Sequence, residues 1–146
     1  MRRGEDHARI RWKLHLERPP AAVYAALATD EGRATFWAER TVASQGTVRF
    51  EFPGGQATES KILAEEPPER FELVYFGTRT RFDLEPDGQG GTDLTLDAWI
   101  PDEGLRKQMA PGWVSVLLAL KAAVDHGIDL RNHDPDRSWT QGYVDN

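Results

Sequence analysis

Apolar residues recur at three- and four-residue steps from Asp102 to Gly127, and no other part of the chain keeps this period for so long. The apolar positions are Leu105, Met109, Trp113, Val116, Leu117, Leu120 and Val124. This spacing is typical of an α-helix with one apolar face. The pattern therefore predicts one long amphipathic helix near the C-terminus.

Upstream of this helix, from Ile10 to Ile100, apolar and polar residues mostly alternate, which is the period of a sheet with one buried face. Proline- and glycine-rich turns separate the alternating segments. We predict strands at residues 8–17, 46–52, 57–64, 70–76, 78–85 and 92–100. The long helix must then lie across an antiparallel sheet, which makes the fold class α+β.

Two short helices are expected after the first strand. A proline pair ends that strand, and its second proline can open a helix over residues 21–28. We expect residues 30–32 (Asp-Glu-Gly) to break this helix and residues 33–37 to form the second one. Phe36 and Trp37 are adjacent there, and we do not expect both to face one core.

Pro111 interrupts the pattern of the long helix, because a proline inside a helix removes one backbone hydrogen bond and costs about 3 kcal/mol. One interpretation is a bend at Pro111 and Gly112 that acts as a hinge near Trp113. The other interpretation, which we favour, is a separate turn over residues 103–110, with the long helix beginning at about Pro111.

Composition narrows the range of partners. With 18 basic and 24 acidic residues the net charge is -6, which disfavours nucleic acid, and we assign Arg2 and Arg3 to a solvated terminus. The chain has no cysteine, which excludes disulfides, thiol nucleophiles and thiolate metal sites. It has neither a signal peptide nor an apolar run of about 20 residues. We expect a cytoplasmic protein that does not bind membranes or nucleic acid.

Candidate catalytic groups are few. The four histidines, at positions 7, 15, 126 and 133, show neither metal-ligand spacing nor the context of a nucleophile elbow. His15 is expected on the solvent face of the first strand. His126 precedes the glycine at the end of the long helix, where the helix dipole favours a histidine. We predict no catalytic residue and no cofactor.

Four polar strand positions are candidates for orienting a ligand or for acid-base chemistry: Glu59, Lys61, Thr95 and Asp97. We expect most of them to face water. A carboxylate enclosed in a cavity would have its pKa raised by desolvation, which would favour an enzyme. A metal site formed by His133, Asp134 and Asp136 is a weaker candidate, because no second cluster accompanies it. We predict no metal.

Apolar residues are spread through residues 128–146, so this tail is expected to be ordered. Asp134-Pro135 is typical of an N-cap followed by a first-turn proline, which predicts a short helix over residues 135–141 that a glycine stops. Trp139 and Tyr143 are four residues apart and would share one side. We expect them to dock on the same chain or, alternatively, on a second copy in a homodimer.

Several short motifs occur in a fixed order along residues 8–127: Pro19-Pro20, Val23-Tyr24, Ala26-Leu27, Thr29-Asp30, Phe36-Trp37, Pro67-Pro68-Glu69-Arg70-Phe71, and Gly112-Trp113 with Leu117 and Leu120. Together they resemble the domain related to the activator of heat shock protein 90 ATPase. That family belongs to the START-related, Bet v 1-like (SRPBCC) superfamily. The resemblance implies a helix-grip fold: a curved antiparallel sheet of six to seven strands around a long C-terminal helix, with two short helices after the first strand.

The resemblance also implies functions. Many superfamily members hold lipids, sterols or polyketides between helix and sheet, and some catalyse cyclisation or hydrolysis there. The eukaryotic co-chaperone has a separate N-terminal domain that engages the chaperone, whereas the first strand here begins at about residue 8, so ATPase activation is not expected. We expect one SRPBCC domain over residues 1–146, with 128–146 as an extension that packs on the domain or on a partner copy.

We therefore predict that a small apolar or amphipathic molecule binds in a cavity between the long helix and the sheet. The alternatives are a cyclase- or hydrolase-type enzyme that uses this cavity, and a co-chaperone-like protein-interaction module. The same apolar residues would also suit an ordinary packed core. The candidate lining residues are Trp37, Phe50, Phe52, Phe71, Tyr75, Phe82, Leu96, Met109, Trp113 and Leu117.

Overall fold

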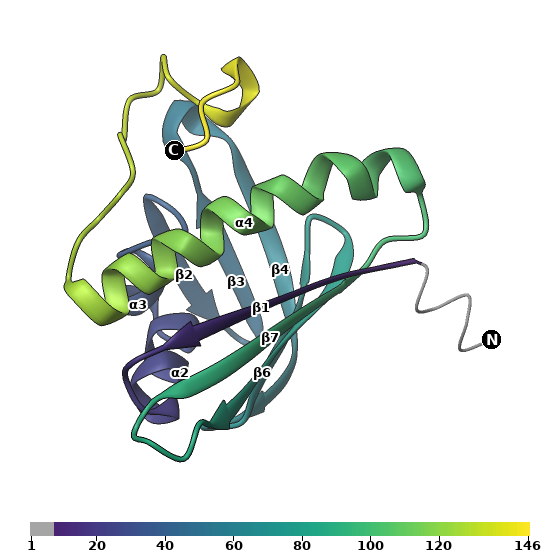
Figure 1. Cartoon of the computed structure of the whole chain (residues 1–146). Helices are drawn as coiled ribbons and strands as arrows, with labels where there is room; N and C mark the ends of the chain where they lie inside the picture. Colours follow the sequence, from purple (N-terminus) through teal and green to yellow (C-terminus); the bar gives the residue numbers. More distant parts are fainter. Residues whose placement is uncertain (1–7) are drawn as a thin grey trace.

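The computed structural model describes residues 8–146, so Arg2, Arg3 and His7 lie outside it. Its elements are β1 (Arg9–Leu16), α2 (Pro20–Ala28), α3 (Asp30–Arg33), β2 (Arg40–Ser44), β3 (Thr47–Glu51), η1 (Pro53–Gly55), β4 (Ala57–Glu66), β5 (Arg70–Tyr75), β6 (Thr78–Pro86), β7 (Thr92–Trp99), α4 (Glu103–His126) and η2 (Trp139–Gln141). The strands form one seven-stranded antiparallel sheet in the order β1-β7-β6-β5-β4-β3-β2. In Figure 1, α4 lies across this sheet.

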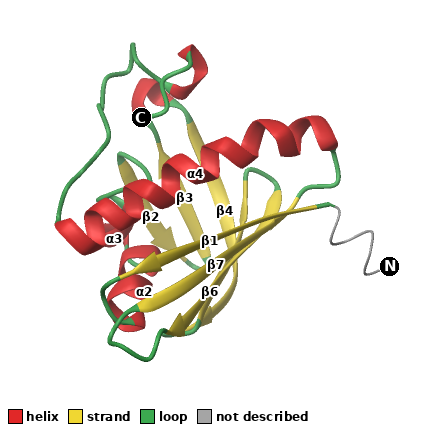
Figure 2. Cartoon of the chain, viewed as in Figure 1, coloured by secondary structure: helices red, strands yellow, loops and turns green. Residues whose placement is uncertain are grey.

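This architecture confirms the predicted α+β helix-grip fold. Figure 2 shows α4 crossing one face of the sheet, with the two short helices following β1. The six predicted strands are present, each within two residues of its expected bounds. The strand that the sequence did not predict is β2, where the burial alternation is weak because four of its five residues are exposed. In the part of the chain that the structure describes, no helix is long and apolar enough to cross a membrane.

The alternation along the strands places apolar side chains on the face that α4 covers. Phe82, Leu94 and Leu96 are fully buried there, and α4 contributes Leu117 and Leu120. Close packing of such side chains removes apolar surface from water, at about 25 cal/mol for each Å². The core therefore lies between α4 and the centre of the sheet.

The long helix is continuous through Pro111, so the interpretation of a separate turn over residues 103–110 was wrong. The Asp102 carboxylate accepts the Leu105 backbone N–H at 2.9 Å, which starts the helix eight residues before the position we favoured. At the other end Gly127 is left-handed, with a φ of 64°, as helix stops require. Pro111 leaves one helical carbonyl without its usual donor, and the helix tolerates this loss.

We expected residues 30–32 to separate the two short helices. Instead, these residues form most of α3. The helix begins there because the Thr29 hydroxyl accepts the Gly32 N–H at 3.0 Å. A Cβ at Gly32 would lie 2.4 Å from the Ala25 carbonyl oxygen, so this glycine allows α2 and α3 to pack closely. Residues 34–37 form a turn instead of the predicted helix.

Phe36 and Trp37 are both buried, at 2% and 4% exposure, which contradicts the expectation that adjacent aromatics cannot share one core. Their rings stack, with centroids 5.7 Å apart. The expectation failed because it assumed helical geometry, whereas a turn can direct neighbouring side chains to the same side. The Arg33 carbonyl fixes this turn by accepting the N–H groups of Phe36 and Trp37.

The tail also differs from its prediction. Only Trp139–Gln141 forms a helical turn, a 3-10 turn, in place of a helix over residues 135–141. The Asp134 carboxylate caps the Asp136 N–H at 2.8 Å, but the helical turn itself starts at Ser138, whose side chain pairs with that of Gln141. The expected glycine stop is present, because Gly142 is left-handed.

Candidate functional site

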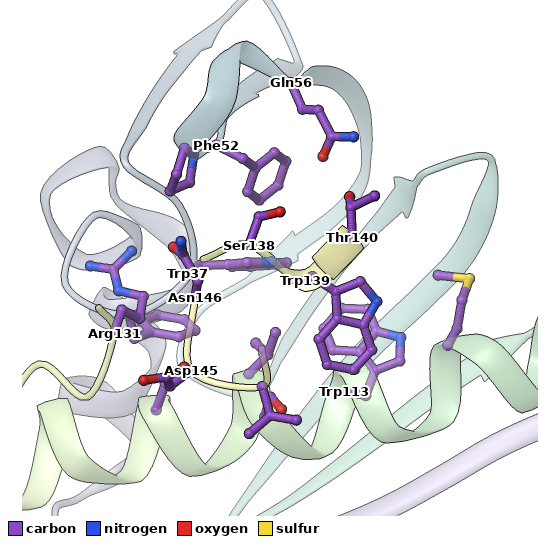
Figure 3. A pocket seen from close by; sticks show the side chains of 18 of the residues that line it. Trp37, Phe52, Gln56, Trp113, Arg131, Ser138, Trp139, Thr140, Asp145 and Asn146 are labelled. Carbon is purple, nitrogen blue, oxygen red and sulfur yellow. The ribbon is translucent and has the colours of Figure 1, made fainter. Parts of the chain in front are cut away.

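A pocket of about 960 Å³ opens between α4, the turn after α3, the β3–β4 turn, the end of β5 and the tail. In Figure 3, Phe52 and Gln56 lie on the side opposite α4, and the tail residues Ser138 and Thr140 lie between these two walls. The pocket is open to solvent, since Phe76 and Leu118 in its wall are each about half exposed. It is large enough for a drug-sized molecule.

One wall is a face of α4. Its residues follow the helical period, and they are Leu105, Gln108, Met109, Gly112, Trp113, Ser115, Val116, Leu118 and Ala119. Gly112 stands at the middle of this wall, where a Cβ would lie 3.7 Å from Cζ2 of Trp139. The tail tryptophan therefore covers the helix at the residue with no side chain.

A second wall is aromatic and comes from the turn after α3 and from the strand ends: Phe36, Trp37, Phe52, Pro53, Gln56, Tyr75 and Phe76. Trp37 is its centre. The Trp37 ring centroid lies 5.4 Å from that of Tyr75, 5.6 Å from that of Phe82 and 6.1 Å from that of Trp113. These contacts join the pocket wall to the core, so the wall is held in place by packing.

The tail forms the third wall and is fastened to its own chain. The Arg131 guanidinium donates to the carbonyl oxygens of Ala34 and Ala38, both at 2.7 Å, and its side chain is only 7% exposed. In Figure 1 the tail turns back from the end of α4 toward the β3–β4 turn. There the Pro135 carbonyl would lie 3.9 Å from a Cβ placed on Gly54. The tail thus packs on its own chain. Trp139 and Tyr143 remain about two-fifths exposed, and a homodimer through them stays a prediction.

Charged groups fasten the base of the tail. His133 contacts Glu39 through Nδ1 and Asp129 through Nε2, the second at 2.7 Å. The hydrogen bond to Asp129 raises the pKa of His133 above its usual range, partial burial opposes this, and Glu39 adds to the rise. Partial burial raises the pKa of Asp129, but hydrogen bonds from Arg131 and His133 outweigh it and hold that pKa at about 2. His133 therefore joins the tail to Glu39, the residue before β2, while Asp129 holds His133 from within the tail.

Two indole N–H groups lie behind the surface of the pocket and have no partner among the described residues. The indole N–H groups of Trp37 and Trp113 are shielded from solvent and make no hydrogen bond with the described residues. The Tyr75 ring packs against both of these rings, and burial raises the pKa of its phenol, with a smaller opposite effect from Trp37. The phenol is therefore uncharged at neutral pH. Most buried polar groups in proteins are hydrogen-bonded, so these two N–H groups are notable.

Five of the ten predicted lining residues are in the pocket wall: Trp37, Phe52, Tyr75, Met109 and Trp113. The other five, Phe50, Phe71, Phe82, Leu96 and Leu117, lie in the packed core behind it. Both groups have the same apolar period, which is why the sequence did not separate them. That any of them touches a ligand stays a prediction.

The four polar strand positions are outside the pocket wall. Asp97 is fully buried, but it lies on the opposite face of β7 from Leu96, where its carboxylate accepts from Arg11 Nε at 2.7 Å and lies 3.7 Å from Arg81 Nη2. Glu59 and Lys61 are exposed, and Thr95 is half-buried. Asp97, the buried carboxylate among these four positions, is thus ion-paired with arginines on the face of the sheet that points away from α4.

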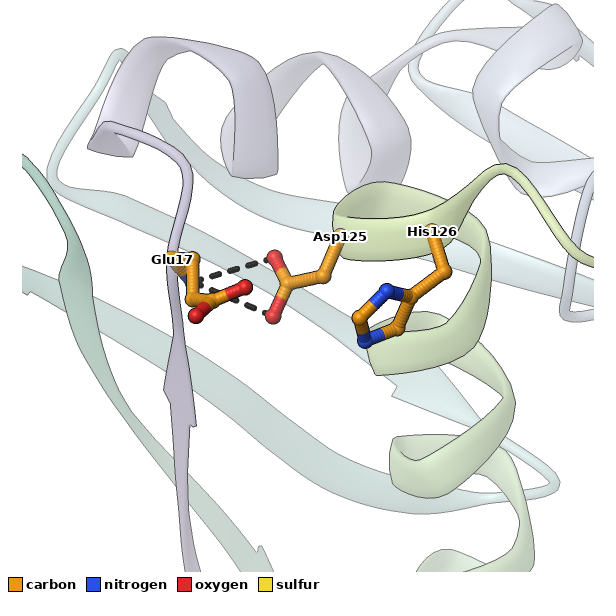
Figure 4. Close-up of side chains that lie close together, drawn as sticks. All are labelled: Glu17, Asp125 and His126. Atoms are coloured by element: carbon orange, nitrogen blue, oxygen red, sulfur yellow. Dashed lines mark hydrogen bonds between the residues drawn. The ribbon is translucent and has the colours of Figure 1, made fainter.

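His15 has a structural partner, and His126 lies in a small cluster of titratable groups. His15 is half exposed and lies 2.8 Å from the Asp87 carboxylate, and this hydrogen bond holds the pKa of Asp87 at about 2. His126 lies beside Glu17 and Asp125, the one group in the described range with the spacing of metal ligands (Figure 4).

In this group, the Asp125 carboxylate already accepts hydrogen bonds from other groups of the protein. The Asp125 carboxylate accepts the Glu17 backbone N–H at 3.0 and 3.1 Å and the Lys121 ammonium at 2.9 Å. Burial raises the pKa of Asp125, but these donors outweigh it and lower the pKa overall. A cation would have to displace the ammonium group, so Asp125 is better suited to fixing α4 against β1.

Sequence reasoning missed most of the pocket wall that the tail supplies. Leu130, Arg131, Ser138, Thr140, Val144, Asp145 and Asn146 line it, together with Trp139. The signal was present in Trp139, which we expected to dock on the chain. The location of that docking depends on Arg131, whose partners are backbone carbonyls that no side-chain pattern identifies.

No protein-family model and no curated protein matches this chain. Several solved structures are similar to this chain. Protein SSP2350 from Staphylococcus saprophyticus is 22% identical, with a TM-score of 0.74 over 84% of this chain and 96% of that chain. The Aha1 dimer from Colwellia psychrerythraea is 23% identical, with a TM-score of 0.71 over 82% of this chain and 97% of that one.

DynU16, a protein of the dynemicin biosynthetic locus, is 20% identical, with a TM-score of 0.72. The match covers 84% of this chain and about half (49%) of DynU16. At these identities the similarity shows the shared helix-grip fold alone.

Proposed function

We propose that this protein binds a small apolar or amphipathic molecule in the pocket between α4, the strand ends and the tail. The observation that carries the proposal is an open pocket of about 960 Å³ whose wall is mainly apolar and aromatic but contains a few uncharged polar side chains, among them Gln108, Ser115 and Thr140. Ligand pockets typically combine apolar walls with a few placed polar groups. We also infer a relation to the Aha1-like family, which the order of the sequence motifs and the Aha1 fold similarity support.

Binding accounts for the pocket better than catalysis does. The titratable side chains in its wall are Tyr75, Arg131 and Asp145. Arg131 is hydrogen-bonded to two carbonyls and to Asp129, and the Asp145 carboxylate accepts from the Asn132 amide at 3.0 Å. A buried neutral phenol alone is a poor acid or base at neutral pH.

The test is binding of the uncharged dye N-phenyl-1-naphthylamine, whose fluorescence rises in apolar surroundings. Gly112→Leu would place a side chain in the pocket between α4 and Trp139. We expect it to weaken dye binding at least about tenfold, because the new side chain takes space and contacts from the dye. Lys107→Leu adds the same side chain on an exposed position of α4 outside this pocket and should bind as the wild type does.

Thermal unfolding of both variants checks that each is folded. Dye that binds Gly112→Leu and the wild type equally, or no dye binding to the wild type at all, would overturn ligand binding in this pocket. Equal loss in both variants would also contradict it, because the effect would not depend on the pocket.

A further inference from the structure

Residues 132–146, which we call the tail loop, are bonded mainly to one another. The Asn132 N–H donates to the Asp145 carbonyl oxygen at 2.7 Å, and the Asn132 side-chain amide donates to the Asp145 carboxylate at 3.0 Å. The Asn146 side-chain amide donates to two carbonyl oxygens inside the loop, at 2.7 and 3.0 Å. In the described part of the chain, every hydrogen bond of residues 134–146 has its partner within the tail loop. The loop is therefore closed on itself rather than bonded to the pocket that it covers.

The tail loop is attached at one end. Arg131, the residue before it, is the buried anchor that donates to two backbone carbonyls of the turn after α3. Beyond this anchor, the polar contacts between the tail loop and the preceding described residues all come from His133, which contacts Glu39 and Asp129. The backbone of His133 is left-handed, with a φ of 57°, which is uncommon for a residue that has a side chain. Such strained residues occur where the surrounding contacts hold them, often at clamps and switches.

The other end of the tail loop lies over the pocket through apolar contacts. Figure 3 shows Trp139 and Thr140 between α4 and Phe52. A Cβ placed on Gly112 would lie 3.7 Å from Cζ2 of Trp139, so the indole covers α4 at that residue. Trp139 and Val144 both line the pocket, yet they are 43% and 65% exposed. An element with few buried contacts and no hydrogen bonds to its support opens more easily than the core.

We propose that the tail loop is a lid that hinges beside Arg131 and controls entry to and exit from the pocket, with the contact between His133 and Glu39 as its latch. The lid rests on the proposed function, because ligand exchange is the step that it controls. Breaking the latch should expose the α4 wall beneath Trp139 and should speed the release of a bound molecule, as lid opening does in other proteins.

A thiol under the lid measures opening without any ligand. The chain has no cysteine, so one introduced thiol reports alone. Gly112→Cys places its Cβ at van der Waals distance from the Trp139 ring. Its reaction with the uncharged reagent 4,4′-dithiodipyridine should be at least about tenfold slower than that of Lys107→Cys, because an open minor state is populated to about 10% or less. Lys107 is exposed on α4 outside this pocket.

Two further substitutions break the latch from opposite sides. Glu39→Ala removes the acceptor, and His133→Gly removes the imidazole while glycine adopts the left-handed backbone without strain. Each should speed the reaction of the Gly112→Cys thiol about threefold to fivefold, the factor that a partly exposed ion pair provides. The Lys107→Cys thiol should react as before. Glu85→Ala, which truncates an exposed glutamate of β6, is the matched control and should change neither rate.

Release of N-phenyl-1-naphthylamine connects the lid to ligand exchange. Protein loaded with the dye is mixed in a stopped-flow instrument with excess β-cyclodextrin, which traps the released dye. Glu39→Ala and His133→Gly, each with Gly112 retained, should release the dye faster by about the factor found for the thiol. Glu85→Ala should release it at the wild-type rate. Thermal unfolding checks each variant, and if His133→Gly does not fold, Glu39→Ala decides.

Four results overturn the lid while leaving ligand binding intact. They are equal reactivity of the Gly112→Cys and Lys107→Cys thiols, no acceleration by the latch variants, equal acceleration by Glu85→Ala, and a faster thiol reaction with unchanged dye release. If the wild type binds no dye, the proposed function fails and the lid has no ligand to control. The thiol rates then still show whether the tail loop opens.

Discussion

The two halves of α4 carry the same apolar period but have different surroundings. In the C-terminal half, Leu117 and Leu120 are 4% and 0% exposed and pack on the centre of the sheet. In the N-terminal half, Met109 and Gly112 face a pocket. The difference comes from what lies opposite: fully buried strand side chains in one case, and turns and a tail in the other. Periodicity identifies the face of a helix that other elements cover. Whether a pocket remains between the helix and those elements depends on the size and position of the side chains opposite.

The largest effect should come from removing a side chain in the filled half. Leu120→Ala should lower the free energy of unfolding by about 3 kcal/mol, because it removes buried contacts and leaves a cavity. Leu105→Ala, in the pocket wall of the N-terminal half and 40% exposed, should cost less than about 1 kcal/mol. Urea denaturation of both variants measures the difference. Equal losses would contradict the contrast between the two halves.

An intermediate effect should follow from releasing the tail. Arg131→Met keeps a side chain of similar length but removes the donors to Ala34 and Ala38, so we expect a loss of about 1–2 kcal/mol. Hydrogen exchange in residues 128–146 should accelerate, while exchange in the centre of the sheet should not. Arg137→Met is the control, since Arg137 is 59% exposed and its side chain pairs with Asp134 inside the tail. Unchanged exchange in Arg131→Met would show that other contacts hold the tail.

The smallest effect should be a dependence of tail docking on pH. The pKa of His133 is raised in the folded protein, so protonated His133 stabilises tail docking. This stabilisation is complete below about pH 6.5 and is lost as pH rises through the folded-state pKa. Asp129 has a pKa of about 2 in the folded protein, compared with an ordinary value of 3.8. Its carboxylate therefore stabilises docking above about pH 4, and this stabilisation is lost as pH falls toward 2. Docking should therefore be tightest between about pH 4 and 6.5, by about 0.5 kcal/mol, because these groups are partly exposed.

Hydrogen exchange of the tail across this range measures the effect. His133→Gln should abolish the loss at high pH and keep the loss at low pH, because Asp129 still accepts from Arg131. A wild-type tail whose exchange, corrected for the intrinsic pH dependence, is flat from pH 4 to 9 would rule out His133 as a pH-dependent contact.

The sequence predicted the sheet and the long helix well, because alternation and helical period report burial directly. It failed where backbone groups rather than side-chain patterns decide the structure. The start of α4 depends on the Asp102 cap, and α3 depends on the Thr29 cap and on the close approach at Gly32. The strand β2 was missed because an exposed edge strand has little apolar alternation.

For the site, the sequence predicted aromatic wall residues such as Trp37 and Trp113 but also selected core residues such as Phe71. The distinction depends on volume, which arises only when several elements meet in space. The role of Arg131 could not be inferred either, because its partners are the carbonyls of residues about 95 positions earlier in the chain. Long-range backbone contacts leave no trace in a local pattern.

The pairing of β1 with β7 has a consequence for biosynthesis. Arg9 lies opposite Trp99, and β1 has no other neighbour in the sheet. Since β1 leaves the ribosome before β7, it must wait for this partner, which takes roughly 5–20 s at translation rates of about 5–20 residues per second. During this interval its apolar residues have no partner strand, and a nascent chain with such high contact order is slow to fold and exposed to aggregation.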